Sequence, residues 1–126
     1  MKIDHIAVAS NSIEASDRFF MELLGLKKSK TFTVSAELME QFFGINKEHN
    51  FVRYQNDNLG VEVIISNENS KAIDVFTHSC LIVENREAFI KKSSSMGFKT
   101  IKVQRKDGEG YYSFVKDSFG NLYEIK

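Results

Sequence analysis

The stretches Val61-Glu62-Val63-Ile64 and Tyr123-Glu124-Ile125-Lys126 share one pattern, in which a glutamate stands between apolar residues typical of a strand. Upstream of them, Ile3-Asp4-His5 aligns with Phe76-Thr77-His78. A histidine thus matches a histidine, and a glutamate matches a glutamate, at equal places in two halves of the chain. Such self-similarity predicts a protein built from two copies of one short motif.

Working outward from these stretches, the first half alternates between strand-like and helix-like patterns. Alternating apolar residues predict strands at residues 2–9, 26–34, 49–55 and 60–65. Ser12 is a helix cap, and Gly25 is expected to end the helix that Ser12 begins. A second, short apolar helix is predicted at residues 36–43, in a segment that the second half lacks.

The second half repeats this order of elements. Strands are predicted at residues 73–83, 98–104, 111–116 and 122–125, with one helix that starts at Asn85 and ends at Gly97. The whole pattern predicts an α+β fold of two βαβββ modules. The modules are residues 1–66 and 73–126, and a polar linker at residues 67–72 joins them within one domain, residues 1–126.

Composition excludes several classes of protein. The formal net charge is 0 and no basic stripe is present, so a nucleic-acid role has no electrostatic support. No apolar run approaches the roughly 20 residues of a membrane span, and no export segment precedes the first strand, so we expect a cytoplasmic protein. Cys80 is the only cysteine, which excludes an internal disulfide and a thiolate zinc cluster.

Strand geometry brings the repeated polar residues to one side of the sheet. Side chains alternate across a strand, and the apolar neighbours of Glu62 and of Glu124 suit packing under a helix. Both glutamates should therefore point away from the helices. His5 and His78 are expected on the same side, so all four side chains can line the concave face of a curved sheet.

These four residues suit a divalent metal ion. Two imidazoles and two carboxylates around such a cation satisfy each other and leave the site neutral. Mixed nitrogen and oxygen donors favour Zn, Ni, Co, Mn or Fe(II) rather than calcium. An octahedral ion held by His5, Glu62, His78 and Glu124 would keep two positions open for water or for a substrate with adjacent oxygens. Such a metal can stabilise an enediolate formed next to a carbonyl.

Structural interpretations stand beside this one. The four residues could be an inherited set that holds no metal, because single strand histidines and glutamates are often structural or solvated. His49 has no equivalent in the repeat and is expected at the surface. Cys80 is expected to be a small buried hydrophobe, and Phe42-Phe43 to fill the core, although the phenylalanines could also wall a pocket. Asp117 and Asn121 flank a turn and suit turn chemistry.

Three stretches resemble the glyoxalase and vicinal oxygen chelate superfamily: residues 3–8, residues 20–26, and the closing run from Phe114 to Glu124. The resemblance covers essentially the whole chain. It implies that each module forms a half-barrel, that the two half-barrels pair around a cupped site, and that the protein is a homodimer. It also implies that His5, Glu62, His78 and Glu124 fall where the metal ligands of glyoxalase I sit.

One loop departs from the family pattern. The family usually carries Asp-Pro-(Asp/Glu)-Gly before its last strand, and this chain reads Asp117-Ser118-Phe119-Gly120. The chain contains no proline, so the turn must be made in another way. No residue set marks a glutathione, coenzyme A or fosfomycin site.

The resemblance favours a metal-dependent lyase or isomerase, similar to lactoylglutathione lyase, acting on a small-molecule substrate. Its substrate would bind the metal through adjacent oxygens, and Glu124 or Glu62 would shuttle a proton between neighbouring carbons. One alternative is a metal-free module that binds a small molecule, as bleomycin-resistance proteins do. Another is an epimerase of an acyl-CoA thioester. Substrate identity, the metal and the choice of base stay open at this point.

Overall fold

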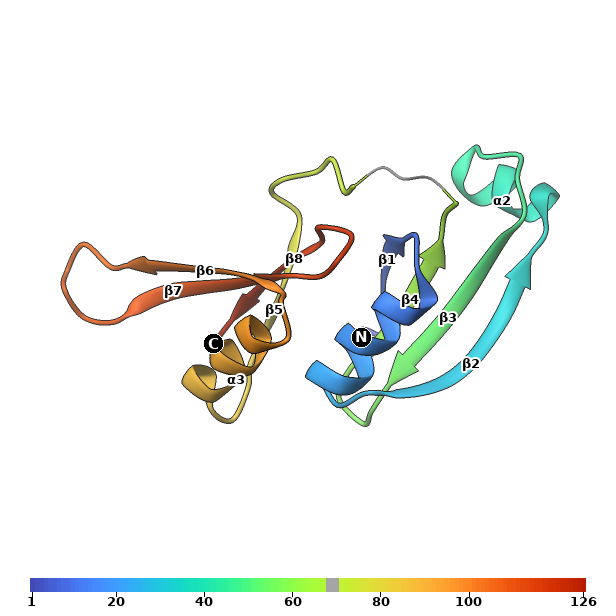
Figure 1. Ribbon diagram of the computed structural model, residues 1–126. Coiled ribbons are helices and arrows are strands. Elements are labelled where there is room, and N and C mark those ends of the chain that lie inside the picture. Colours follow the sequence, from blue (N-terminus) through green and yellow to red (C-terminus); the bar gives the residue numbers. More distant parts are fainter. Residues whose placement is uncertain (68–70) are drawn as a thin grey trace. The chain divides into compact units, whose positions relative to one another are not determined.

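The strands form two four-stranded mixed sheets, one in each half of the chain (Figure 1). The computed structural model describes residues 1–67 and 71–126. Its two compact units lie before and after residues 68–70, so the predicted linker at 67–72 falls partly outside the described residues. No helix in the described ranges is long and apolar enough to cross a membrane.

The first sheet has the strand order β1-β4-β3-β2. Strands β1 and β4 run parallel, whereas β3 pairs antiparallel with both of its neighbours. The elements of this half, in chain order, are β1 (Ile6–Ser10), α1 (Ile13–Asp17), the π-helical segment η1 (Arg18–Leu23), β2 (Lys27–Val34), α2 (Ala36–Phe43), β3 (His49–Gln55) and β4 (Gly60–Ile65).

The second sheet has the equivalent order β5-β8-β7-β6, again with its first and last strands parallel. Its elements are β5 (His78–Leu81), α3 (Arg86–Ser95), β6 (Lys99–Gln104), β7 (Tyr111–Lys116) and β8 (Leu122–Ile125). The predicted α+β fold of two βαβββ modules is therefore confirmed, with α2 as the extra helix of the first module.

One face of the first sheet packs against the helix that follows β1. Val52 and Tyr54 on β3, and Val61 and Val63 on β4, are completely buried on this face. Ser12 caps the helix by accepting a hydrogen bond from the backbone N–H of Ala15, as expected. The next residues continue as a π-helix, η1, which the apolar spacing did not reveal.

The π-helical turn brings neighbouring aromatic residues into the core together. Phe19 and Phe20 are each 1% exposed, and their rings meet edge to face with centroids 5.1 Å apart. Phe20 also stacks on Tyr54 at 5.1 Å. The Tyr54 hydroxyl donates a hydrogen bond of 2.7 Å to Asp17, so its one buried polar atom is satisfied.

The opposite face of this sheet carries a smaller apolar cluster under α2. Met39 of α2 packs with Val34 and Phe51, and Phe32 and Ile64 border them. Phe51 and Ile64 are paired in the β3–β4 ladder, on the same face as Glu62. Helix α2 therefore covers part of the face on which the predicted metal ligand lies.

Two predicted strands are shorter in the structure. Strand β1 begins at Ile6 rather than at residue 2, and β5 spans His78–Leu81 rather than residues 73–83. Each of these strands pairs with β4 or β8, and the pairing starts at Ile6 and at His78. Apolar alternation before those points has no partner strand in the described residues, so it forms no ladder.

The loop before β8 is built around Asp117 instead of a proline. Its Oδ1 accepts hydrogen bonds from the backbone N–H groups of Phe119, Gly120 and Asn121, at 2.9–3.1 Å. Its Oδ2 accepts from the side-chain amide of Asn121 at 2.8 Å. Asp117 is only 8% exposed, and this burial raises the pKa of its carboxyl group. Turn chemistry at Asp117 and Asn121 is thus confirmed.

Replacing Asp117 with Ala should destabilise the protein by about 2–4 kcal/mol, because several donors lose their acceptor in a buried loop. Asp107 offers a matched control, since it accepts one backbone hydrogen bond, from Glu109, in an exposed turn. Asp107→Ala should cost less than about 1 kcal/mol. Urea unfolding of both variants gives the comparison, and equal losses would contradict the assigned role.

Candidate metal centre

The strand register places the repeated residues at equivalent positions in the two halves. Ala7 is the Cα partner of Glu62 in the first half, and Cys80 is the partner of Glu124 in the second. In each half the histidine lies two residues before that partner, so it shares a face with the glutamate. Within each half, the predicted histidine and glutamate are neighbours.

In the first half, His5 and Glu62 are in direct contact. Nε2 of His5 lies 3.3 Å from Oε2 of Glu62, and their side chains are 36% and 15% exposed. A third residue, Arg53, joins them from β3, where it is the Cα partner of Glu62. Its Nη1 lies 3.3 Å from Oε1 of Glu62 and 3.1 Å from Nδ1 of His5.

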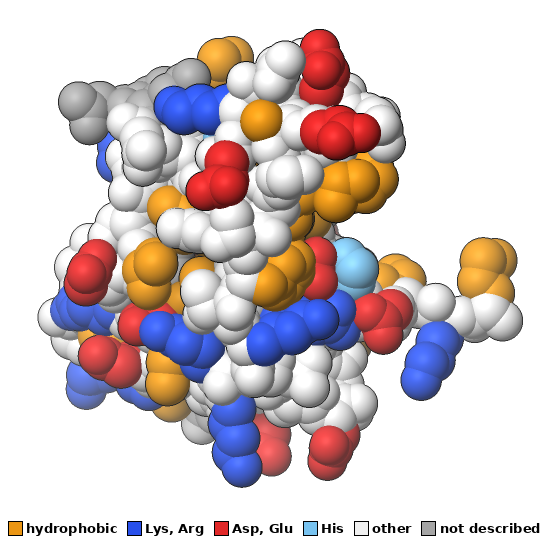
Figure 2. All heavy atoms as spheres, turned by 90° about the vertical axis from the view of Figure 1, so that its right-hand side faces the viewer, with side chains coloured by type: hydrophobic (Ala, Val, Ile, Leu, Met, Phe, Trp, Pro, Cys, Tyr) orange, Lys and Arg blue, Asp and Glu red, His pale blue; other side chains and the backbone are white. Residues whose placement is uncertain are grey.

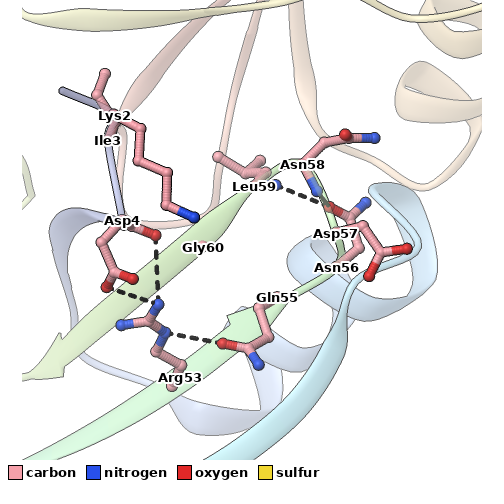
Figure 3. A pocket seen from close by; sticks show the side chains of 10 residues that line it. All are labelled: Lys2, Ile3, Asp4, Arg53, Gln55, Asn56, Asp57, Asn58, Leu59 and Gly60. Carbon is pink, nitrogen blue, oxygen red and sulfur yellow. Dashed lines mark hydrogen bonds and ion pairs between the residues drawn. The ribbon is translucent and has the colours of Figure 1, made fainter.

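Arg53 also binds Asp4 and Gln55 (Figure 3). Nη2 donates to Oδ2 of Asp4 at 3.0 Å and to its backbone oxygen at 3.3 Å, and Nε donates to Gln55 at 3.1 Å. The contact with His5 and the guanidinium of Arg53 lower the pKa of Asp4, and the bond to Asp4 raises the pKa of Arg53. The sequence analysis missed Arg53. The turn at residues 56–59 joins β3 to β4, and counting back from this turn along both strands would have placed Arg53 opposite Glu62.

Gly60 makes room for this cluster. A Cβ atom at position 60 would lie 2.6 Å from the backbone oxygen of Asp4 and 2.9 Å from Nη2 of Arg53. The first contact involves backbone, so it could not be relieved by turning a side chain. The same stretch borders an open pocket of about 400 Å³, lined by polar side chains from β3, from the β3–β4 turn and from residues 2–4 (Figure 3).

The second pair, His78 and Glu124, consists of the same two residue types but has different neighbours. Nε2 of His78 lies 3.7 Å from Oε2 of Glu124. Nδ1 of His78 lies 2.8 Å from the backbone oxygen of Phe76, which can only accept, so Nδ1 carries the ring proton. The Cα partner of Glu124 is Phe114, whose ring meets the His78 ring edge to face at 5.8 Å. Among the described residues of this half, the ammonium group of Lys126 pairs with Glu124 at 3.4 Å, and the Lys126 side chain is 57% exposed.

A turn centred on Asp74 holds the segment that precedes His78. Its carboxylate accepts hydrogen bonds from the Thr77 hydroxyl and from the backbone N–H groups of Thr77 and Phe76. These bonds, the Thr77 hydroxyl first, lower the pKa of Asp74 to about 2. The turn therefore fixes the position of the Phe76 carbonyl, and this carbonyl orients the ring of His78 through the hydrogen bond to Nδ1.

The second pair fits a metal ion better than the first. In a neutral His78 with its proton on Nδ1, the Nε2 lone pair would face the Glu124 carboxylate, and a metal ion or a second ring proton between the two acceptors would relieve that contact. In the first pair, the guanidinium of Arg53 already neutralises Glu62. No group of three or more His, Cys, Asp or Glu side chains forms a metal cluster within either described half.

Two side-chain predictions were wrong. Cys80 is exposed rather than buried, and loss of water contacts together with the Glu124 carboxylate raises the pKa of its thiol. Phe42 and Phe43 are 62% and 52% exposed rather than part of the core. Figure 2 looks onto the side of the first half that carries α2 and β2, where hydrophobic side chains lie exposed among charged ones. Helix α2 buries Met39 instead, which lies one turn earlier.

His49 lies at the start of β3, away from both pairs in the strand register. Its Nδ1 is 2.8 Å from the backbone oxygen of Lys47, so this nitrogen also carries the ring proton. The neighbouring residues Lys47 and Glu48 are exposed. The ring of His49 is thus held by the backbone rather than by His5 or Glu62.

With this geometry in view, comparison with known proteins identifies the family. Residues 2–125 match the Glyoxalase/Bleomycin resistance protein/Dioxygenase superfamily, and the chain belongs to it. Among curated proteins, no sequence matches this chain.

Solved structures share the fold at low sequence identity. A glyoxalase family protein from Enterococcus faecalis is 20% identical, with a TM-score of 0.73 over 98% of this chain and 95% of that one. The trypanothione-dependent glyoxalase I of Leishmania major is 16% identical, with a TM-score of 0.69 over 99% and 85%. A fosfomycin resistance protein from Listeria monocytogenes, solved with Mn(II), is 12% identical, with a TM-score of 0.69 over 98% and 87%.

Replacing Thr77 with Val should raise the pKa of Asp74 from about 2 towards the ordinary value near 3.8, because the largest stabilising donor is removed. A lowered pKa in the folded state gives stability that is present above the unfolded pKa and lost as pH falls through the folded pKa. Wild type should therefore keep the turn to about pH 2, and the variant should lose it at higher pH. Carboxyl carbon NMR titration of wild type and variant measures the pKa of Asp74 in each.

Proposed function

We propose that this protein is a metal-dependent lyase or isomerase of the glyoxalase I type. The observation that carries the proposal is the His78–Glu124 pair, in which Nε2 of the imidazole lies 3.7 Å from a carboxylate oxygen while Nδ1 is hydrogen-bonded to the backbone oxygen of Phe76. The same pair of residue types recurs as His5 and Glu62 at the equivalent register positions. A repeated histidine–glutamate pair is the donor set that Zn, Ni, Co, Mn and Fe(II) accept.

In this proposal, His5, Glu62, His78 and Glu124 hold one divalent ion. When bound, the ion polarises substrate oxygens and offsets the charge that develops on them. The substrate is a small molecule with adjacent oxygens, such as a hydroxyl next to a carbonyl. The protein's own residues orient the substrate and move a proton between neighbouring carbons.

We assign the proton transfer to Glu124 rather than to Glu62. Glu62 is 15% exposed and is held through Oε1 by Arg53, so its carboxylate has a fixed orientation and a neighbouring positive charge. Glu124 lies instead beside the exposed ammonium group of Lys126, at 3.4 Å, and beside the thiol of Cys80. A carboxylate that accepts and returns a proton must be free to turn, and Glu124 meets that requirement better.

A metal-free binding module is the second candidate, and the first pair favours it. Arg53 satisfies Glu62 and His5 without any metal ion. The polar pocket beside this cluster offers amide, carboxylate and ammonium groups for a small polar ligand. An epimerase of an acyl-CoA thioester would use the same four residues, so a substrate screen must separate it from the lyase.

Wild type should bind one Zn, Ni, Co or Mn ion, and His5→Ala or Glu124→Gln should weaken that binding at least roughly tenfold while keeping the fold. Each change removes a donor and leaves an incomplete shell. Affinity should fall as pH drops through the histidine range, since protons compete for the ring nitrogens. Isothermal calorimetry on protein without a histidine tag gives the measurement.

His49→Ala is the matched control, because its ring contacts a backbone oxygen and neither glutamate. It should bind the metal as wild type does. Absence of divalent binding near neutral pH, or equal affinity of His5→Ala and wild type, would reject the metal-dependent enzyme and favour the binding module. Turnover of candidate substrates by the metal-loaded protein then separates a lyase from an epimerase.

We also propose that the protein is a homodimer. The sheet orders leave β1 and β2 at the edges of the first sheet, and β5 and β6 at the edges of the second. Unpaired edges favour association that covers them. Sedimentation velocity at micromolar concentration should give the mass of two chains, and a single species at 14.4 kDa would contradict the proposal.

A further inference from the structure

Arg53 has a complete set of acceptors. A guanidinium carries five N–H donors in a fixed fork. Nε donates to Gln55, the two hydrogens of Nη2 reach the backbone and side-chain oxygens of Asp4, and Nη1 has two remaining neighbours. Those neighbours are Oε1 of Glu62 and Nδ1 of His5, at 3.3 and 3.1 Å. All five donors are used only if Nδ1 of His5 accepts, which requires that it carry no proton.

Asp4 makes the opposite demand on the same nitrogen. Oδ2 of Asp4 lies 2.9 Å from Nδ1 of His5, and a carboxylate oxygen can only accept. Arg53 and Asp4 therefore favour different tautomers of the His5 ring. A proton on Nδ1 satisfies Asp4, and a proton on Nε2 satisfies Arg53.

Counting unfavourable contacts decides between the two tautomers. With the proton on Nδ1, two donors face each other at Arg53, and two acceptors face each other where Nε2 lies 3.3 Å from Oε2 of Glu62. With the proton on Nε2, only Asp4 and Nδ1 are an acceptor pair. Asp4 is 73% exposed and also receives Nη2 of Arg53, so water and the guanidinium offset that contact. The Nε2 proton meanwhile bonds Glu62.

We propose that Arg53 is a positioning residue that fixes His5 in the tautomer with its proton on Nε2, which keeps the first pair closed to metal ions until the guanidinium moves. His78 is in the opposite tautomer, because its Nδ1 donates to the oxygen of Phe76. The position equivalent to Arg53 in the second half is occupied by Phe114, which has no donor. The two histidine–glutamate pairs therefore differ in how readily they can bind a metal ion, although their strand registers are alike.

The consequence for metal binding rests on the proposed function. A metal ion at Nε2 of His5 would require the ring proton to sit on Nδ1. There it would donate to Asp4, but it would also face the Nη1 donor of Arg53, which would have to move. The positive charge of Arg53 also opposes a divalent ion beside Glu62. Removing the guanidinium should thus ease metal binding by the first pair.

The test begins with metal-free, ¹⁵N-labelled protein at about pH 8.5, where an ordinary histidine with a pKa near 6.5 is neutral. Long-range proton–nitrogen NMR correlations show which ring nitrogen is protonated, and the chain has only three histidines. We expect His5 with the proton on Nε2, and His49 and His78 with the proton on Nδ1. Single histidine-to-glutamine variants assign the signals.

Arg53→Met keeps an unbranched, flexible side chain and removes the donors and the charge. His5 should then change to the Nδ1 tautomer, and Zn²⁺ affinity in calorimetry should rise roughly tenfold. Arg105→Met is the matched control, since Arg105 lies over the ring of Tyr112 at 4.8 Å in the other half. Arg105→Met should change neither the tautomer of His5 nor the Zn²⁺ affinity.

A proton on Nδ1 of His5 in wild type overturns the proposal, and this reading does not depend on whether the variant folds. An unchanged His5 tautomer in Arg53→Met, or equal Zn²⁺ affinity of variant and wild type, also overturns it. If neither protein binds a divalent ion, the proposed enzyme fails, whereas the tautomer reading of metal-free protein still decides the role of Arg53.

Discussion

The parallel pairing of the first and last strands in each half is the constraint on which the rest depends. Parallel neighbours cannot be joined by a tight turn, so a long crossover must connect them. In each half that crossover consists of a helix and two further strands. The helix covers one face and buries the β-branched and aromatic residues of the final strand. The residues that alternate with them, Glu62 and Glu124, are left on the other face, beside a histidine that directly precedes β1 or begins β5. The parallel register in each half thus determines both which residues enter the core and which residues lie together at the candidate site.

Two equivalent backbones carry two different electrostatic environments. In the first half the residue across from the glutamate is Arg53, and in the second it is Phe114. The guanidinium gives Glu62 a permanent counter-charge, whereas Glu124 has the solvated ammonium group of Lys126. The two halves share one strand register, and a single cross-strand position is enough to give their carboxylates different neighbours.

Sequence patterns predicted the elements that local signals define. Residues 36–43, 49–55, 60–65, 111–116 and 122–125 have the predicted bounds, because turn residues and alternation mark both ends. The excess length predicted for β1 and β5 arose because alternation does not reveal whether a partner strand is present. The π-helical turn leaves no mark in the apolar spacing. His5 and Glu62 could be paired by repeat symmetry, whereas Arg53 could be found only by placing β3 and β4 in register.

Gly60 limits which substitutions the first half can accept. A side chain at this position collides with the backbone of Asp4 and with Arg53, so it is tolerated only after the segment at residues 2–5 has moved away. Once that segment has moved and position 60 has changed, restoring arginine at position 53 would no longer rebuild the cluster. A side chain at position 60 is therefore incompatible with the present arrangement of Asp4 and Arg53.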